Sequence, residues 1–362
     1  MLPKLSLWAE LLLAAAVAFA ISYFTTPPVK AFAEKVGAID VPRDARRVHT
    51  HPIPRMGGLA IFLGFVVSLL LFVNMTTQVT GILLGAVIIA VMGAVDDIVS
   101  LNPWVKLAGQ IVAAVVAIRC GLVFQVITNP LSSNGIIEIG WLSIPLTILW
   151  IVGCTNAVNL VDGLDGLAVG VSAISALTML FVALFVSEPA VSVILAALTG
   201  ACIGFMPYNL NPAKIFMGDV GSQFLGYVLS TVSIMGLFKF HAIITFLVPL
   251  LALAVPLADT VFAFIRRIAH GQSPFHADRG HFHHRLLDMG MNQKQVVALL
   301  YGVSAVLGLI AVLLAGNMAW VRITCLVAAF AISITVWLFV FRGNTRLHPG
   351  HPEEGTEDCP DK

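Results

Sequence analysis

Charged side chains are scarce in this chain. Only 11% of its 362 residues are Asp, Glu, Lys or Arg, whereas 59% are hydrophobic. A soluble domain carries about 25% charged residues, so this composition excludes an ordinary soluble protein and indicates that lipid is the solvent. The net charge of +1 says little, because the placement of charge decides how a membrane protein is oriented.

Paired cysteines are also missing. The five cysteines are scattered along the chain, and no two of them have the spacing of a disulfide framework or a zinc site. We interpret them as unpaired packing residues, and nothing in the chain indicates secretion. They are Cys120, Cys154, Cys202, Cys325 and Cys359.

No polar stretch is long enough to form a soluble domain. Instead, apolar runs recur, each long enough to cross a ~30 Å hydrocarbon core as a helix, and open strands would leave backbone groups unpaired there. The first run precedes a dense basic segment, so we interpret it as an uncleaved helix and not as a signal peptide. We therefore predict an all-α integral membrane protein with about 11 transmembrane helices, organised as one polytopic catalytic domain over 1–341 and a polar, disordered tail over 342–362. The runs are 7–25, 57–74, 79–95, 106–125, 141–158, 167–186, 190–207, 223–239, 242–264, 295–315 and 319–341.

Alternating these spans across the membrane sorts the charges sharply. One side collects 16 of the 20 Lys and Arg residues, and by the positive-inside rule that side is the cytosol. The amino terminus is then outside and the carboxyl terminus cytosolic. The same side also holds 16 of the 19 Asp and Glu residues, although the rule makes no demand on them. This second asymmetry indicates a polar site at the cytosolic face.

The third predicted span ends in an aspartate pair, Asp96-Asp97. Adjacent ionised carboxylates repel each other, and an aspartate within a span costs about 2.5–3.5 kcal/mol on insertion scales. A metal ion, or a phosphate with its metal, would relieve both penalties. The alternative is an ordinary helix end with solvated aspartates.

The fifth predicted span ends in a second polar motif. Asn156, Asn159 and Asp162 recur at three-residue spacing, so on a helix they share one face. Glycines then permit a tight reversal around Asp165 and a close approach of backbone to a ligand. A generic turn would explain the glycines and aspartates but not the two asparagines upstream.

The loop Tyr208–Ser222 holds a third motif, which includes Asn209. Its glycines can turn backbone amides toward an anion, and Asp219 is a hard oxygen ligand of the kind magnesium prefers. Phe216 could stack on a nucleobase, although contact with the membrane is the commoner fate of such a residue. An ordinary loop is the alternative.

A long cytosolic loop is rich in histidine and arginine. No cysteine accompanies the histidines, and their spacing matches no known zinc motif. Histidine beside arginine suits a polyanion through charge-assisted hydrogen bonds to phosphate, and a metal site or a solvated basic loop are the alternatives. The residues are His276, Arg279, His281, His283, His284 and Arg285.

The first loop adds further basic groups, among them Arg47, His49 and Arg55, followed by Gly57-Gly58. Their alternative role is purely topological, because such charges retain a loop in the cytosol. All five motifs lie on the same predicted face, although they are spread from residue 43 to residue 285. Hard carboxylates, phosphate-binding groups and an aromatic at a membrane surface together indicate magnesium-assisted phosphoryl chemistry between a nucleotide and a lipid.

In this order the motifs resemble those of the polyprenyl-phosphate N-acetylhexosamine-1-phosphate transferases, glycosyltransferase family 4. The resemblance runs from the first loop to about residue 300 and is carried by Asp96-Asp97, the run 156–168, Phe216-Met217-Gly218-Asp219 and His281-Phe282-His283-His284. It implies an all-helical membrane fold and an exchange that depends on Mg²⁺, with Mn²⁺ as a substitute. The lipid phosphate attacks the β-phosphorus of a UDP-sugar, and UMP leaves.

The resemblance also implies roles for individual residues. Asp219 is then the magnesium ligand with help from Asp97, and Asp96 and Asp97 handle the lipid phosphate or the metal. Phosphate-binding roles fall on Lys106, His281, His283 and His284. The substrate-binding set is Asn156, Asn159, Asp162, Asp165, Asn209, Phe216, Arg279, Arg47, His49 and Arg55, with Asp165 and Phe216 nearest the uracil.

The spaced histidines distinguish two branches of that family. An uninterrupted triplet is typical of the muramoyl-pentapeptide branch, whereas His281-Phe282-His283-His284 resembles the branch that transfers N-acetylglucosamine 1-phosphate and begins teichoic acid, lipopolysaccharide O-antigen or arabinogalactan synthesis. Ser100 departs from the family's third acidic position, which removes any essential carboxylate there. The implied partners are UDP-N-acetylglucosamine, undecaprenyl phosphate and membrane lipid, with no nucleic acid and a homodimer left open. The implied location is the bacterial plasma membrane, with the site facing the cytosol.

Two other classes compete with this interpretation. A transporter should carry its charges near the middle of its spans and show paired repeats with broken helices, whereas these charges sit at predicted helix ends and no repeat is evident. A polyprenyl-pyrophosphate hydrolase would share the phosphate-binding groups but would not need a uracil pocket. Binding of UMP therefore discriminates the hydrolase from the transferase.

Overall fold

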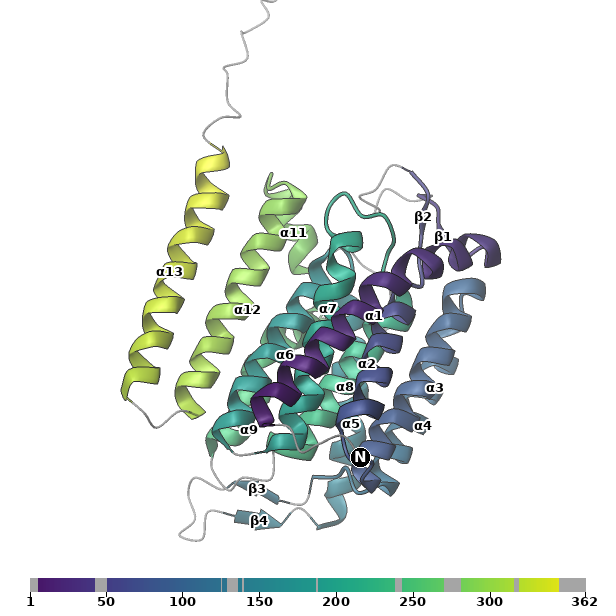
Figure 1. Cartoon of the computed structure of the whole chain (residues 1–362). Coiled ribbons are helices and arrows are strands. Elements are labelled where there is room, and N and C mark those ends of the chain that lie inside the picture. The colour runs from purple at the N-terminus through teal and green to yellow at the C-terminus, as the bar shows by residue number, and fades with distance from the viewer. Residues whose placement is uncertain are drawn as a thin grey trace, which may run out of the picture.

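A computed structural model describes residues 6–42, 51–124, 126–128, 136–138, 140–186, 188–237, 243–269, 281–315 and 319–344. Helices dominate these residues, and every predicted apolar run is helical over most of its described part (Figure 1). The α-helices are α1 (Leu7–Val36), α2 (Gly58–Phe72), α3 (Thr77–Val99), α4 (Pro103–Arg119), α5 (Ser143–Val161), α6 (Leu167–Phe185), α7 (Pro189–Asn209), α8 (Gly218–Val232), α9 (Ile243–Ala252), α10 (Ala254–Ala269), α11 (Phe282–Asp288), α12 (Gln293–Ala315) and α13 (Ala319–Asn344). A short 3₁₀ turn (Gly140–Leu142) precedes α5, and a π-helical turn (Ser233–Leu237) follows α8.

Six helical segments in the described part of the chain are long and apolar enough to cross a bilayer. Large apolar side chains are exposed along the outer faces of the bundle, for example Leu12, Leu70 and Leu149. Such faces are stable only against hydrocarbon. The chain is therefore an all-α membrane protein, as its composition predicted. The six segments are Leu7–Val36, Thr77–Val99, Gly140–Val161, Leu167–Phe185, Pro189–Asn209 and Gln293–Ala315.

Helix α8 lies at the centre of the bundle. Every residue from Val220 to Val232 is buried, and α8 packs against α2, α3 and α5. Helix α1 crosses α2 and α7, α6 lies between α7 and α12, and α13 packs on α12 at the edge of the bundle (Figure 1). The amino-terminal end of α8 thus meets elements from several distant parts of the chain.

Glycines allow α8 to approach its neighbours this closely. A Cβ atom on Gly58, at the start of α2, would lie 2.1 Å from the backbone of Gly221, and a Cβ on Gly93 of α3 would lie 2.6 Å from the backbone of Val220. No side chain fits at such distances, because neither backbone can move away without disturbing its own helix. This packing explains Gly58, whereas a Cβ on Gly57 would lie 2.4 Å from the ring of Phe205 in α7.

We expect Gly58→Ala to lower the apparent thermal stability of the purified protein, because overpacking against a fixed backbone costs about 1–3 kcal/mol. Gly153→Ala is the matched control, since a Cβ at Gly153 in α5 meets nothing within 4 Å. Thermal unfolding in detergent measures both. Equal midpoints for the two variants would contradict the packing assigned to α2 and α8.

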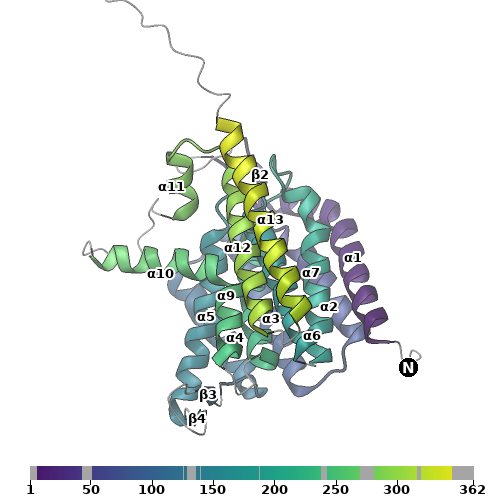
Figure 2. The same cartoon turned by 90° about the vertical axis from the view of Figure 1, so that its left-hand side faces the viewer.

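One predicted span is broken in the structure. The run 242–264 forms two helices, α9 and α10, instead of one. Figure 2 shows α10 running sideways from the bundle while α12 and α13 run along it. Pro249 and Pro256 flank the break, and a proline removes a helical hydrogen bond and clashes with the preceding turn. The prediction of one continuous helix was wrong here, because it relied on the apolar composition of the run and took no account of its two prolines.

Two short antiparallel ladders complete the fold. Strand β1 (Ile39–Asp40) pairs with β2 (Ile53–Pro54), and β3 (Val126–Thr128) pairs with β4 (Ile136–Glu138). Helix α1 continues past its predicted end to Val36, through Pro27 and Pro28, and so delivers the β1–β2 ladder to the end of the bundle where α8 begins. Helix α13 reaches Asn344, three residues into the predicted tail, and the rest of that tail lies outside the described residues.

Candidate active site

A cavity of about 390 Å³ opens where α8 begins. Segments far apart in the sequence line it: β1, the residue after β2, the ends of α3, α5 and α7, the start of α8, α11 and the start of α12. Its lining is strongly polar for a protein of this composition. The lining residues are Asp40, Arg55, Asp97, Asn159, Asp162, Gly163, Leu164, Asp165, Asn209, Phe216, Gly218, Asp219, His284 and Gln293.

The first and third loops are joined by backbone hydrogen bonds. Phe216 N donates to Pro54 O (2.8 Å), Gly57 N donates to Phe216 O (2.9 Å), and Gly58 N donates to Met217 O (2.8 Å). This pairing continues β2 and places Arg55 and Phe216 on the same wall of the cavity. Two motifs that are more than 150 residues apart are therefore parts of one structure.

Asp97 connects α3 to α8. Its carboxylate accepts hydrogen bonds from the backbone amides of Asp219 (3.0 Å) and Val220 (3.3 Å). These are unpaired donors of the first turn of α8, at the positive end of the helix dipole. The glycine-rich loop was expected to bind an anion through its backbone amides. In the structure, two amides at its end bind the carboxylate of Asp97. Arg55 completes the contact by donating to the carbonyl oxygen of Asp97 (2.9 and 3.0 Å).

Lys106 bridges two carboxylates behind the cavity. Its Nζ atom lies 3.1 Å from Asp96 Oδ2 and 2.9 Å from Asp219 Oδ2. Asp219 Oδ2 also accepts a hydrogen bond from Gln223 Nε2 (2.8 Å). Asp96 and Lys106 do not line the cavity themselves, so they reach it through Asp219.

A row of amide side chains continues from Asp219 into the bundle. Gln223 Oε1 accepts from Gln110 Nε2 (2.9 Å), and Gln110 Oε1 accepts from Asn156 Nδ2 (2.7 Å). Gln110 and Gln223 are buried, so their amides need these partners. Asn156, which was predicted to bind substrate, belongs to this row and not to the lining of the cavity.

Asn159 lies about one helical turn further toward the cavity than Asn156, and Asp162 follows the last residue of α5; both line the cavity. Asn159 Oδ1 accepts a hydrogen bond from Ser222 Oγ (2.7 Å), which ties α5 to α8. Burial raises the pKa of Asp162 to about 8, and the like charges of Asp219 and Asp97 act in the same direction. Both effects favour the protonated form of Asp162, and a cation bound beside it would favour release of that proton.

Asp165 and Asn209 hold the turns that enclose the cavity. Asn209 Oδ1 accepts from Gly166 N (3.1 Å), and Asn209 Nδ2 donates to Ile215 O (3.0 Å). Asp165 Oδ2 accepts from Asn211 Nδ2 (2.9 Å) and from Ala213 N (3.0 Å). Both side chains link the loop after α5 to the loop after α7, and both remain on the cavity surface.

The three histidines of the predicted phosphate-binding motif occupy different positions. His284 lines the cavity, and His281 is buried with its Nδ1 donating to Asp259 Oδ2 (2.8 Å). His283 is buried against Gly163, where a Cβ would lie 2.4 Å from its Nε2 atom. Burial and the neighbouring His284 lower the pKa of His283 to about 4. His283 is therefore a neutral imidazole at neutral pH, able to donate a hydrogen bond but carrying no charge.

Asp259 fixes the position of this motif, because its second oxygen accepts from Phe282 N (2.7 Å) at the start of α11. We expect Asp259→Ala to lower turnover about 10–100-fold, as is found when the partner that orients a functional histidine is removed. A double variant that also carries His281→Ala should be no slower than the slower single variant, since one unit is removed. Asp288→Ala, at the exposed end of α11, is the control. Additive losses from Asp259→Ala and His281→Ala would contradict a shared role.

Five functional candidates escaped the sequence analysis. Asp40 and Gln293 line the cavity, while Gln110, Gln223 and Asp259 are buried behind it. The sequence could have identified the last three, because a polar or charged side chain within a predicted span indicates a functional residue. The sequence could not have identified Asp40 and Gln293, since each lies in a polar segment among many other polar residues. Three predicted residues, Arg47, His49 and Arg279, lie outside the described residues.

The cavity suits a hard cation held partly by its substrate. Within the described residues, no three His, Cys, Asp or Glu side chains are grouped as a ready metal site. Asp219, Asp162 and Asp97 nevertheless line one cavity, although both oxygens of Asp97 already accept backbone hydrogen bonds. Magnesium is commonly bound by one or two carboxylates together with waters and substrate phosphates, so this donor set fits it.

Comparison with known proteins agrees with the motifs. A model of glycosyl transferase family 4 matches residues 79–237. The chain is 40% identical, over 85% of its length and 87% of the relative's, to the probable undecaprenyl-phosphate N-acetylglucosaminyl 1-phosphate transferase of Bacillus subtilis (strain 168). It is 38% identical, over 81% and 79%, to the decaprenyl-phosphate N-acetylglucosaminephosphotransferase of Mycobacterium tuberculosis (strain ATCC 25618 / H37Rv). It is also 31% identical, over 71% and 83%, to the phospho-N-acetylmuramoyl-pentapeptide-transferase of Staphylococcus aureus (strain MW2).

The helical bundle, its lipid-facing surface and the polar cavity at one end define a membrane-embedded enzyme. Identities of this size over most of both sequences place it among bacterial transferases. The chain belongs to glycosyl transferase family 4.

Proposed function

We propose that this protein transfers N-acetylglucosamine 1-phosphate from UDP-N-acetylglucosamine to undecaprenyl phosphate. A phosphate oxygen of the lipid attacks the β-phosphorus of the donor, and the bond from that phosphorus to the oxygen bridging it to the α-phosphate breaks. The products are UMP and a lipid-linked pyrophosphoryl sugar, the first intermediate of a cell-envelope polymer. The observation that carries the proposal is the cavity, which combines carboxylates, Arg55 and the ring of Phe216 in a chain whose relatives are named for this transfer.

Magnesium, with manganese as a substitute, is the proposed cofactor, held by Asp219 with Asp97 close by. When bound it would neutralise charge on the pyrophosphate oxygens. Asp97 already accepts two amide hydrogen bonds, so its main contribution is to fix the start of α8. Lys106 keeps the Asp219 carboxylate in place through the contact of 2.9 Å, and Asp96 completes that ion pair. This arrangement supports a preorganised metal ligand that needs little movement when substrate enters.

The substrate phosphates are assigned to the cavity's basic and imidazole groups. Arg55 and His284 line the cavity, and His281 and His283 support His284 from behind. Asn159, Asp162, Asp165, Asn209 and Phe216 form the proposed donor pocket, in which a planar base can stack on the aromatic ring. We also assign Arg47, His49 and Arg279 to substrate binding, because they belong to the two basic loops that flank these groups in sequence.

The proposed topology has eleven spans, with the broken pair α9 and α10 counted as one of them. The amino terminus is outside, and the carboxyl terminus and the cavity are in the cytosol of a bacterium. The distribution of 16 of the 20 basic residues supports it. Reporter fusions at Thr50 and Asn344 should read as cytosolic and a fusion at Asn317 as external. A cytosolic Asn317 would refute this topology.

The surrounding membrane lipid and a second copy of the chain are the remaining proposed partners.

The donor is the part of the proposal that an activity assay tests most sharply. Purified protein should release UMP when given undecaprenyl phosphate and UDP-N-acetylglucosamine, and it should not use UDP-muramoyl-pentapeptide. Discrimination against a donor with unmatched polar groups can reach about 10⁴-fold, whereas UDP-N-acetylgalactosamine differs by one hydroxyl epimer and should be rejected less strongly. Comparable turnover of the pentapeptide donor would place the enzyme with the muramoyl-pentapeptide transferases, with which it shares 31% identity.

A further inference from the structure

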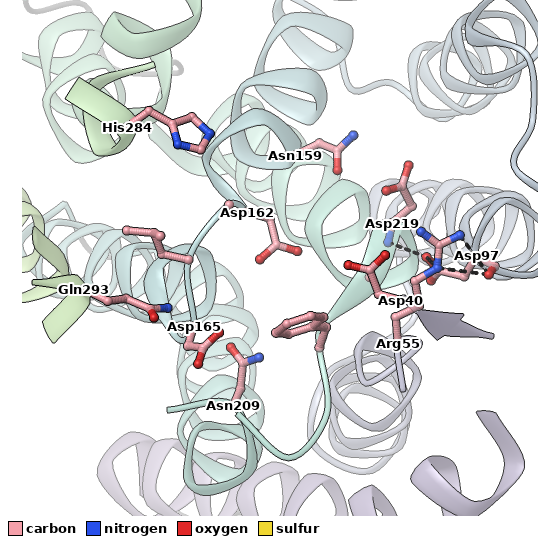
Figure 3. A pocket seen from close by; sticks show the side chains of 14 residues that line it. Asp40, Arg55, Asp97, Asn159, Asp162, Asp165, Asn209, Asp219, His284 and Gln293 are labelled. Atoms are coloured by element: carbon pink, nitrogen blue, oxygen red, sulfur yellow. Dashed lines mark hydrogen bonds and ion pairs between the residues drawn. The ribbon is translucent and has the colours of Figure 1, made fainter. Parts of the chain in front are cut away.

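Three polar side chains form a hydrogen-bonded row on one side of the cavity. Asn211 Nδ2 donates to Asp165 Oδ2 (2.9 Å) and to Gln293 Oε1 (2.8 Å). Asp165 and Gln293 both line the cavity, and Figure 3 shows them together on the side opposite Asp97, Asp219 and Arg55. The row therefore lies away from Asp97, Asp219 and Arg55, while His284 is on its own side of the cavity (Figure 3).

The chemistry of the row determines which way each amide is turned. A carboxylate only accepts hydrogen bonds, so Asn211 must present its amide nitrogen to Asp165. The same nitrogen faces Gln293, which must therefore present its oxygen. The Nε2 group of Gln293 is then directed away from Asn211. In the described part of the chain, neither Gln293 Nε2 nor Asp165 Oδ1 makes another hydrogen bond.

The row thus offers the cavity one free donor beside one free acceptor. Arg55, the arginine of the lining, lies opposite (Figure 3), so among the lining residues a phosphate would meet no guanidinium or ammonium group beside the row. A planar imide fits instead. Uracil displays a carbonyl acceptor, O4, next to a donor, N3–H, and both lie on one edge of a ring that can stack on an aromatic such as Phe216. Cytosine displays the reverse, an N4 amino donor next to an N3 acceptor.

We propose that Gln293 determines the nucleobase specificity of the enzyme. It donates Nε2–H to uracil O4, while Asp165 Oδ1 accepts from N3–H, and Asn211 transmits the orientation from Asp165 to Gln293. The inference rests on the proposed function, which requires a UDP-sugar donor, and adds the residue that distinguishes uracil from cytosine.

The test is nucleotide binding to the full-length protein in detergent with Mg²⁺, with UMP and CMP titrated separately by calorimetry. Gln293→Glu keeps the length of the side chain and an oxygen that can accept from Asn211, but replaces the free donor by an acceptor. The ratio of UMP to CMP affinity should fall by about 10-fold or more. Gln293→Leu removes the donor without adding an acceptor, so it should weaken UMP binding without strengthening CMP binding. Lys294→Gln, at the exposed neighbouring position, is the matched control and should behave as the wild type.

An unchanged UMP to CMP ratio in Gln293→Glu would overturn the inference, and so would a loss of affinity that is equal for both nucleotides, which would indicate a structural role alone. Either result leaves the proposed function standing, provided the wild-type protein binds UMP and releases it during turnover. A wild-type protein that binds neither nucleotide would overturn the proposed function, and this inference with it.

Discussion

Replacing Asp219 by asparagine should reduce turnover by about 10²–10³-fold or more, the scale of losing one preorganised electrostatic group from an active site. The substitution preserves the size of the side chain and leaves an oxygen that can accept from Lys106 and Gln223, whose contacts of 2.9 and 2.8 Å hold it in place. The protein should therefore still fold. What is lost is the charge that binds magnesium, so initial rates measured over a range of Mg²⁺ concentrations should show the defect.

The same experiment checks the identity of the metal. Manganese should restore the wild-type enzyme after treatment with a chelator better than calcium does, because calcium needs a larger and looser coordination shell. Glu34→Gln is a suitable control, since Glu34 is an exposed acidic residue of α1. Full turnover in excess EDTA would contradict the assignment of Asp219 to a metal and would leave the carboxylates with a metal-free role.

Lys106→Met should have the second largest effect. The substitution removes the only cation described between Asp96 and Asp219, whose side chains are 8% and 21% exposed. Two facing carboxylates would then lack a cationic partner, and breaking such a partly buried ion pair should cost about 2 kcal/mol of stability. The apparent thermal midpoint should fall, and turnover should fall about 10²-fold because the Asp219 carboxylate is no longer held.

A double variant separates the two effects. Adding Asp96→Asn to Lys106→Met removes the like-charge repulsion, so thermal stability should recover in part, whereas turnover should stay low. Unfolding followed by intrinsic fluorescence and the rate of UMP release measure the two quantities on one preparation. Recovery of both together would mean that Lys106 serves the fold alone.

The sequence predicted the elements of this protein better than the contacts between them. Hydrophobic runs located the helices because hydrocarbon enforces a minimum length and an internally bonded backbone. They failed at 242–264, where Pro249 and Pro256 break one run into α9 and α10. Composition averages over a run, whereas a proline acts at one backbone position.

For the site, the spacing of polar residues along the chain predicted part of the arrangement. It led to Asn159 and Asp162 as neighbours on one helical face, and the structure places both on the cavity. It could not show that Asn156, one turn away, bonds to Gln110, or that Lys106 meets a carboxylate 113 residues later. The packing of the helices determines which side chains meet. This packing depends on close contacts such as that of Gly58 with Gly221, and the spacing of residues along the chain does not predict such contacts.

The fate of the β-phosphate tests the central claim most directly. Purified protein is given undecaprenyl phosphate, Mg²⁺ and UDP-N-acetylglucosamine labelled with ³²P at the β-phosphorus and with ¹⁴C in the sugar, and the organic phase is counted. Both labels should enter the lipid in equal amounts, accompanied by the same amount of UMP. Transfer of the sugar label alone, with the ³²P retained in released UDP, or ³²P appearing as free phosphate, would contradict phosphosugar transfer and the account of the cavity built on it.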